Sequence, residues 1–363
     1  MKREALGLEH FVQQRVRKDI LQRSAYKVLP SDGHIKLDAM ESPYTWSDTF
    51  QKEWLSTLRE VKLNRYPDSV GVGLCEEIRT WCGLHDSASI LLGNGSDELI
   101  QMIIMTLGGP VLAPEPTFGM YRLIAEAIGS QFVGVSLTND FLLDQKKMLS
   151  EIEKHDPSCI FLAYPNNPTG NLFDYTLIKK IIDTANGLVI IDEAYHPYSG
   201  QTFLTEILEN EHMVVLRTFS KLGLAGLRLG YLLGPHPWLE EINKVRLPYN
   251  INSVTQASVR FALSKEAWFQ KQTEKISMER NRLEDALRKY PDVRVYSSRT
   301  NFLLFRLLNK NSDKVFDSLT KQKILIKNMD GTHEALHDCL RVTVGTVEEN
   351  KKFLEALSIA LQD

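Results

Sequence analysis

The sequence predicts an α/β fold, with a mostly parallel central sheet in a large domain and a smaller α+β domain beside it. Short apolar runs alternate with longer amphipathic stretches from about residue 90 to residue 235, which is typical of strands covered by helices. Beyond about residue 250 the pattern changes to a long charged helix, two strands and a last helix. With 363 residues the chain is long enough for two domains.

Six apolar runs are the predicted strands of the large domain. The run at 188–191 is apolar at every position, as expected for a strand that is buried on both faces. After the first run, Ile100, Ile103 and Ile104 recur on one face of a predicted helix. The predicted strands cover residues 89–92, 110–113, 159–163, 188–191, 213–217 and 229–233.

The C-terminal part has its own pattern. A charged helix is predicted over about 266–289, strands over 301–306 and 340–344, and a final helix from about Val347. The first 45 residues lack a core pattern of their own, so we expect them to pack against this part. The expected division is an N-terminal arm at 1–47 that belongs to the small domain, a large domain at 48–250 and a small domain at 251–363.

Composition excludes several classes of function. The chain has 43 basic and 46 acidic residues and a net charge of -3, so no overall positive field attracts nucleic acid or anionic lipid. The 4 cysteines are scattered without metal-ligand spacing, which predicts a reduced protein without a metal site. The first 25 residues are charged and no apolar run reaches membrane-spanning length. We therefore expect no signal peptide, no membrane and a cytoplasmic location.

Polar motifs follow the carboxyl ends of several predicted strands. They lie at residues 93–98, 114–118, 164–170, 192–195 and 220–221. In open α/β sheets, ligands bind outside those strand ends. The sequence therefore predicts one binding site at this edge of the sheet.

Residues 218–231, TFSKLGLAGLRLGY, contain the most informative motif. Lys221 offers an amine that can form a Schiff base, and Arg228, seven residues later, offers a guanidinium for a phosphate. Pyridoxal 5'-phosphate (PLP) requires both groups. Taken alone, the two residues can equally be a surface lysine and a surface arginine beside a glycine-containing loop.

Two further motifs fit a phosphate and a pyridine ring. The glycines before Ser96, Asp97 and Glu98 expose amides at a predicted helix start, which favours an anion; plain capping by Ser96 or Asp97 is the alternative. Asp192 ends a buried strand and can hold a proton on a pyridine nitrogen, with Tyr195 near the ring oxygen. In isolation, Asp192 is as well explained as a helix cap.

Three more residues are ambiguous in isolation. Asn167, in the proline-fixed turn YPNNPTG, can bond the same ring oxygen or only shape the turn. Phe118 can stack on the ring or belong to the core. His196 follows the site motif, and we assign it a structural role because a released lysine already supplies the base.

The ordered set NRYPD, GNGSDEL, PTFGMY, PNNPTG, DEAY and SK…GLR resembles the class I/II aminotransferases of PLP fold type I. The subgroup most resembled is histidinol-phosphate aminotransferase, through IKLDAMESPY, NRYPD, DEAYHPYSG and LRVTVGTVEEN. The resemblance covers nearly the whole chain, from about Tyr26 to Asn350.

The resemblance implies a role for each motif residue. Lys221 is the lysine that binds PLP covalently and shuttles the proton, and Asp192 pairs with the pyridine nitrogen. Asn167 and Tyr195 hold the ring oxygen, and Phe118 stacks on the ring. The phosphate is held by backbone at Ser96, Asp97 and Glu98 and by Ser220 and Arg228.

The resemblance also implies partners. Tyr66 reaches the cofactor phosphate of a neighbouring subunit, which implies a homodimer with shared sites. The substrate contacts are Tyr26, Arg341 and Lys327. Lys327 stands where the subgroup usually has arginine, and Met40 stands where it usually has asparagine. The interval from lysine to arginine is seven residues, where many relatives have eight.

The expected reaction moves the amino group of L-histidinol phosphate to 2-oxoglutarate, giving imidazole acetol phosphate and glutamate. Two alternatives of the same fold stay open: an aminotransferase for aromatic or many amino acids, and an amino-phosphate decarboxylase. A PLP-binding regulatory module is disfavoured because the chain carries no basic DNA-binding region.

Overall fold

The computed structural model describes residues 7–25, 29–84 and 88–362. Its largest element is a seven-stranded sheet in the order β2-β8-β7-β6-β5-β3-β4. β8 runs antiparallel to both of its neighbours, and the other neighbouring pairs are parallel. The strands are β2 (Ser89–Asn94), β3 (Val111–Glu115), β4 (Phe132–Ser136), β5 (Cys159–Ala163), β6 (Leu188–Asp192), β7 (Met213–Thr218) and β8 (Leu229–Gly234).

Six of these strands match the predicted ones to within two residues at each end. The seventh, β4, has no counterpart in the prediction because its sequence, FVGVS, is short and contains Gly134. It lies at the edge of the sheet, parallel to β3. A Cβ at position 134 would lie 1.9 Å from a carboxylate oxygen of Glu115, so the close approach of that side chain requires the glycine.

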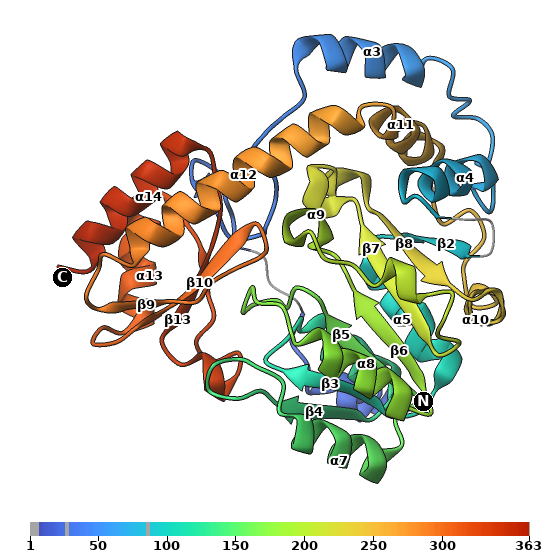
Figure 1. The fold of residues 1–363 in the computed structure, drawn as a ribbon, viewed down its shortest axis with the longest axis horizontal. Helices are drawn as coiled ribbons and strands as arrows, with labels where there is room; N and C mark the ends of the chain where they lie inside the picture. Colours follow the sequence, from blue (N-terminus) through green and yellow to red (C-terminus); the bar gives the residue numbers. More distant parts are fainter. Residues whose placement is uncertain (1–6, 26–28, 85–87, 363) are drawn as a thin grey trace.

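Helices cover both faces of the sheet, which makes three layers (Figure 1). On β5, Ile160 and Leu162 face one core while Cys159 and Phe161 face the other, because successive strand residues point to opposite faces. One face packs on α4 (Val72–Trp81), α7 (Gln145–His155) and α8 (Tyr175–Thr184). The other packs on α5 (Ser96–Leu107), α6 (Met120–Ile128) and α10 (His236–Asn243).

A second, smaller sheet has the strand order β12-β13-β10-β9. Its core contains Phe305, Phe353 and Leu357, and a capping box at Thr346 starts the last helix. Figure 1 shows α12 running from the α11 side of the large sheet to this smaller unit. The elements are α12 (Glu266–Leu287), β9 (Val293–Val295), β10 (Phe302–Leu307), α13 (Ser312–Lys321), β11 (Ile324–Leu325), β12 (Lys327–Asn328), β13 (Cys339–Thr343) and α14 (Val347–Ala360).

The N-terminal segment contacts both parts of the molecule. β1 (Ile35–Lys36) pairs with β11 in the small unit, in line with the expected packing. By contrast, Arg17 donates to the carbonyl of Ala127 at 3.1 Å and Arg23 pairs with Glu126 at 3.0 Å, so these residues lie against α6 of the large sheet. The exact domain limits at 47/48 and 250/251 stay a prediction.

Several shorter elements complete the described chain. α3 (Asp48–Leu58) packs on α11 (Ser253–Leu263), where the Trp54 indole donates to the hydroxyl of Ser258 at 2.8 Å. Within the described ranges, no helix has the length and apolarity needed to cross a bilayer. The remaining elements are α1 (Leu8–Arg15), α2 (Lys18–Leu21), α9 (His196–Ser199) and the 3-10 turns η1 (Leu204–Glu206), η2 (Ser220–Leu222), η3 (Ala225–Leu227) and η4 (Glu334–Leu336).

Candidate active site

A cavity of about 390 Å³ lies at the carboxyl edge of the large sheet. The ends of β5, β6 and β7 contribute Ala163, Asp192 and Thr218 to its wall. The structure therefore brings together most of the polar motifs that the sequence places after strands. The predicted site residues that line the cavity are Ser96, Asp97, Phe118, Asn167, Asp192, Tyr195, Ser220, Lys221 and Arg228.

Lys221 lies in the short turn η2, directly after β7. Burial lowers the pKa of its ammonium to about 8, and the positive charge of Arg341 acts in the same direction. Its backbone carbonyl accepts a hydrogen bond from the Tyr198 hydroxyl at 2.6 Å. The Nζ atom lies 5.7 Å from the centre of the Tyr195 ring. A buried amine with this pKa is neutral in a substantial fraction of molecules near neutral pH.

Asp192 is the last residue of β6 and is buried. One carboxylate oxygen accepts from the amide of Ala194 at 3.0 Å, and the other accepts from the Tyr121 hydroxyl at 2.6 Å. Burial raises the pKa of this carboxyl to about 6, while both hydrogen bonds oppose that rise. The following helix α9 has Tyr195 as its N-cap residue, so Asp192 is not a helix cap.

The amino end of α5 forms a backbone cradle at the cavity. Its N-cap residue is Gly95, with φ of 83°, and glycine adopts that conformation without a Cβ clash. A Cβ at Gly230 of β8 would lie 2.6 Å from the amide nitrogen of Ser96. Both glycines therefore leave room for the amide groups that begin the helix, and such amides favour an anion.

Arg228 and Asp97 meet at the outer side of this cradle. Their side chains approach to 3.2 Å and are 50% and 40% exposed, respectively. A Cβ at Gly95 would lie 2.5 Å from a guanidinium nitrogen of Arg228. On the inner side, the Thr218 hydroxyl donates to the Ser220 hydroxyl at 2.9 Å. The cradle thus offers one cation and one hydroxyl beside the α5 amides.

Arg341 joins the smaller sheet to the cavity. It lies on β13, where it pairs with Lys327 of β12 in the antiparallel register. Its guanidinium donates to the side-chain oxygen of Asn167 at 2.6 Å and to the carbonyl of Asp38 at 3.0 Å. Arg341 is buried and Lys327 is partly exposed. Positive charge therefore lies behind Asn167 in the cavity wall.

Three predicted site residues do not line the cavity within this chain. The Glu98 carboxylate accepts from the Asn250 amide at 2.7 Å and points away from it. Tyr66 is 80% exposed and stacks on Tyr249 with a centroid distance of 4.5 Å. Tyr26 lies outside the described residues.

Sequence reasoning missed Tyr121 and Tyr198, which hold the backbone or the carboxylate of the two central residues. Tyr121 comes three positions after Phe118 in PTFGMY, and Tyr198 comes three positions after Tyr195. That spacing, which returns a helical side chain to the same face, was the available signal. His196 is held by burial well below its usual pKa and contacts the Glu193 carbonyl at 3.2 Å, outside the cavity lining.

The sequence of residues 33–357 matches the model of the family described as aminotransferase class I and II. Histidinol-phosphate aminotransferase 2 of Nitrosococcus oceani is 48% identical, over 95% of this chain and 97% of that protein. The chain belongs to the class I and II aminotransferases. Among solved structures, the histidinol-phosphate aminotransferase from Clostridium acetobutylicum has a TM-score of 0.83 at 26% identity, over 90% of this chain and 99% of that one.

The fold is shared more widely than the sequence. The histidinol-phosphate aminotransferase from Sinorhizobium meliloti, solved in complex with PLP, superposes with a TM-score of 0.85 at 21% identity, over 96% of this chain and 98% of that one. Class I and II aminotransferases depend on PLP. The resemblance that the motifs predicted, and the fold class with it, is therefore confirmed.

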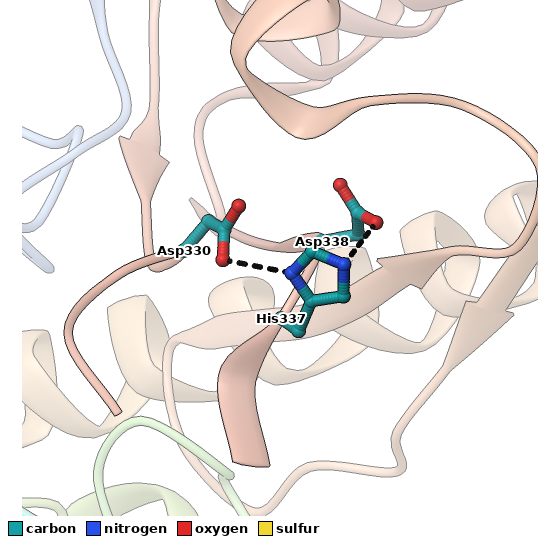
Figure 2. A group of neighbouring side chains, drawn as sticks. All are labelled: Asp330, His337 and Asp338. Atoms are coloured by element: carbon teal, nitrogen blue, oxygen red, sulfur yellow. Dashed lines mark hydrogen bonds and ion pairs between the residues drawn. The ribbon is translucent and has the colours of Figure 1, made fainter. Parts of the chain in front are cut away.

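The aminotransferase also has an acidic cluster far along the chain from the cavity lining. Figure 2 shows Asp330, His337 and Asp338, whose ligand-type atoms lie within 4.8 Å of one another. The His337 ring bonds Asp330 at 3.2 Å through Nδ1 and Asp338 at 3.1 Å through Nε2. Since each ring nitrogen faces a different carboxylate, the cluster has the geometry of an ion pair around an imidazolium. A metal ion would have to displace one of these contacts.

Proposed function

We propose that this aminotransferase transfers the amino group of L-histidinol phosphate to 2-oxoglutarate, with PLP bound at Lys221. The observation that carries the chemistry is the pair of buried groups in one cavity, an amine with a lowered pKa and a carboxylate at the end of β6. The choice of donor is supported by relatives of the same name that are 48% identical over 95% of this chain. The four cysteines are free thiols, which fits the cytoplasmic location that is part of this proposal.

The residues in the cavity fit PLP. A phosphate matches the α5 amides, Ser220 and Arg228, where glycines leave the space that a Cβ would fill. A pyridinium matches the Asp192 carboxylate, and a ring oxygen matches Asn167 and Tyr195. Phe118 lines the same wall and is placed to stack on the ring. Glu98 would contribute through its backbone amide alone, because its carboxylate is engaged by Asn250.

When bound, PLP supplies an aldehyde that condenses with amines and a pyridine ring that withdraws electrons from the carbon bearing the amine. The protein's part is to hold charges and protons. Lys221 Nζ, once free and neutral, accepts the proton from the substrate's α-carbon and returns it to the other carbon. Its pKa of about 8 leaves it a competent base near neutral pH. Asp192, held ionised, keeps a proton on the facing nitrogen.

The substrate end of the cavity is the positive region behind Asn167. Arg341 has a forked guanidinium that suits either a donor phosphate or an acceptor carboxylate. Lys327, opposite it on β12, adds a second positive charge; a lysine acts as a point charge where an arginine would bind with two parallel bonds. Tyr26 is proposed to line the same end.

The proposal includes a homodimer. Tyr66 is 80% exposed and contacts Tyr249 of its own chain, so its hydroxyl is available to a second copy. We propose that it reaches the cofactor phosphate of that copy.

Replacing Lys221 with alanine tests the proposed chemistry. The variant should lose the visible absorbance of covalently bound PLP and lose turnover completely, because no other residue supplies the amine. A matched control is Lys244→Ala, which removes an exposed lysine paired with Glu241. Near-normal turnover of the Lys221 variant would refute the assignment.

A panel of donors tests the substrate. The expected result is fastest single-turnover conversion of bound PLP to pyridoxamine phosphate with L-histidinol phosphate. An equal or faster rate with phenylalanine favours a broader aminotransferase, and release of carbon dioxide from a phosphorylated amino acid favours a decarboxylase. Lys327 in place of arginine and Met40 in place of asparagine are the features that keep both alternatives in the panel.

A further inference from the structure

Tyr121 is a buried polar residue that the reaction described above does not use. It is the second residue of α6 and is fully buried. Its ring stacks on Phe161 of β5 with a centroid distance of 4.7 Å and an interplanar angle of 18°. Phe118 meets the same ring edge-on at 5.6 Å. These contacts fix the ring on two sides, so the hydroxyl has one orientation.

That hydroxyl donates to Asp192 at 2.6 Å. The second Asp192 oxygen accepts from the Ala194 amide at 3.0 Å. A carboxylate has about four lone-pair sites, so both oxygens keep capacity for a partner in the cavity that Asp192 lines. Tyr121 and Ala194 therefore hold the plane of the carboxylate from behind while its front stays available.

The electrostatic surroundings make this hydrogen bond consequential. Burial favours the neutral form of Asp192 and raises its pKa to about 6. The groups facing it are Tyr121 of α6, Asp97 of α5, Lys221 of η2 and the neighbouring Tyr195. Burial and the Asp192 charge hold the pKa of Tyr121 well above its usual range, so Tyr121 stays a neutral donor at any working pH.

We propose that Tyr121 is a positioning residue that keeps Asp192 ionised and aims it at the pyridine nitrogen of the cofactor. The inference rests on the proposed function. A hydrogen bond from a neutral donor to a charged acceptor favours the charged acceptor. The shared proton then stays on the nitrogen, because the carboxylate is a weaker base with Tyr121 than without it.

The variant Tyr121→Phe removes the hydroxyl and keeps every ring contact. In holoenzyme loaded with 15N-labelled PLP, the wild-type nitrogen signal is expected at the protonated-pyridine position. In the variant it should move toward the neutral-pyridine position. We expect kcat to fall about tenfold, with the KM for the donor unchanged, and the acid limb of the kcat/KM profile to move up by about one pH unit. An unchanged nitrogen signal and acid limb would overturn the proposal.

The matched control is Tyr231→Phe. Tyr231 is as deeply buried, and its hydroxyl lies 3.8 Å from the Cys82 sulfur on β8's other contacts, away from the cavity lining. It loses a buried hydroxyl without touching Asp192. Its nitrogen signal and acid limb should match wild type; equal shifts in both variants would mean a general effect of packing, which also overturns the proposal.

A double-mutant cycle isolates the contact. In an Asp192→Asn background no carboxylate remains to be kept ionised, so Tyr121→Phe should change kcat by less than about twofold. The same loss in both backgrounds contradicts the inference. If Tyr121→Phe does not fold, 3-fluorotyrosine at position 121 replaces it. That stronger donor should move the acid limb to lower pH, and a shift to higher pH would count against the inference.

The two proposals fail differently. Wild type that takes up PLP and turns over, combined with an unchanged Tyr121 variant, overturns the role of Tyr121 alone. Wild type that does not take up PLP at Lys221 overturns the proposed function, and the role of Tyr121 falls with it.

Discussion

The floor and the rim of the cavity treat charge in opposite ways. The floor, defined as Asp192, Tyr121 and Lys221, is buried, and burial moves the pKa of the acid up to about 6 and that of the base down to about 8. The rim, defined as Asp97 and Arg228, is 40% and 50% exposed. Charges in a dry region interact strongly, whereas exposed pairs are screened by water and salt.

The difference assigns a task to each region. At the floor, each ionised group depends on named partners, so its protonation state is set by the fold. At the rim, the ion pair contributes less than about 1 kcal/mol, so an incoming phosphate can take over the arginine at little cost. Floor substitutions should therefore change chemistry and pH dependence, and rim substitutions should change cofactor affinity.

The largest expected effect is on catalysis at the floor. Asp192→Asn keeps the shape of the side chain and removes its charge. Uncompensated loss of a buried charge partner is worth about 3–5 kcal/mol, which corresponds to a fall in kcat of about 100- to 10,000-fold. Steady-state kinetics at saturating donor measure it. A kcat within tenfold of wild type would place Asp192 with the rim.

The next effect is on stability and has a defined sign with pH. Folding lowers the pKa of Lys221 from 10.5 to about 8, so the folded cofactor-free protein carries a penalty at every pH below about 8. The penalty shrinks between about pH 8 and pH 10.5 and is absent above. Lys221→Met should therefore stabilise the cofactor-free protein at pH 7 by about 3 kcal/mol.

Denaturant unfolding at pH 7 and pH 10.5 checks the Lys221 prediction. The gain should disappear at the higher pH. The conservative exchange Lys244→Met, at an exposed position, is the control and should leave the unfolding free energy within about 0.5 kcal/mol at both pH values. A gain at Lys221 that does not depend on pH would mean that packing, and not charge, is responsible.

At the rim, Arg228→Gln should weaken PLP binding by about tenfold, because a half-exposed charge-assisted hydrogen bond is lost. Unfolding of the cofactor-free protein should be unaffected. Arg260→Gln is the control, since that arginine is similarly exposed and pairs with Glu77 at 2.6 Å. Equilibrium titration with PLP gives the affinity, and equal weakening by both variants would point to overall charge.

The smallest expected effect comes from Asp97→Asn. Its carboxylate competes with a phosphate for Arg228 at 3.2 Å, so its removal should tighten PLP binding by about two- to threefold. The gain should shrink at high salt because the pair is exposed. Titrations at low and high ionic strength measure it; weaker binding would show that Asp97 orients Arg228 instead of competing.

The sequence predicted the fold and most of the cavity lining, for identifiable reasons. Buried strands such as the one ending at Asp192 are continuous apolar runs, and their carboxyl ends necessarily meet at one edge. β4 was missed because it is an edge strand whose alternation is interrupted by Gly134. The role of Tyr121 was missed because a tyrosine near a helix start has no pattern that distinguishes a hydrogen-bonded ring from core packing.

Side-chain direction was the other limit. Glu98 was predicted at the cofactor from its place in the motif, but its contact with Asn250 depends on a segment more than a hundred residues later. The N-terminal segment divides between two packing partners for the same reason, since the pairing of Arg23 with Glu126 is a long-range contact.

The guanidinium of Arg341 ties together three stretches of chain, at Asp38, Asn167 and its own strand. During translation the ribosome delivers the first two long before the third. The wall behind Asn167 cannot close until β13 has left the exit tunnel, by which time the seven-stranded sheet can already have folded. Capture of the vitamin-derived cofactor in its final geometry is therefore expected to be a late, nearly post-synthetic event.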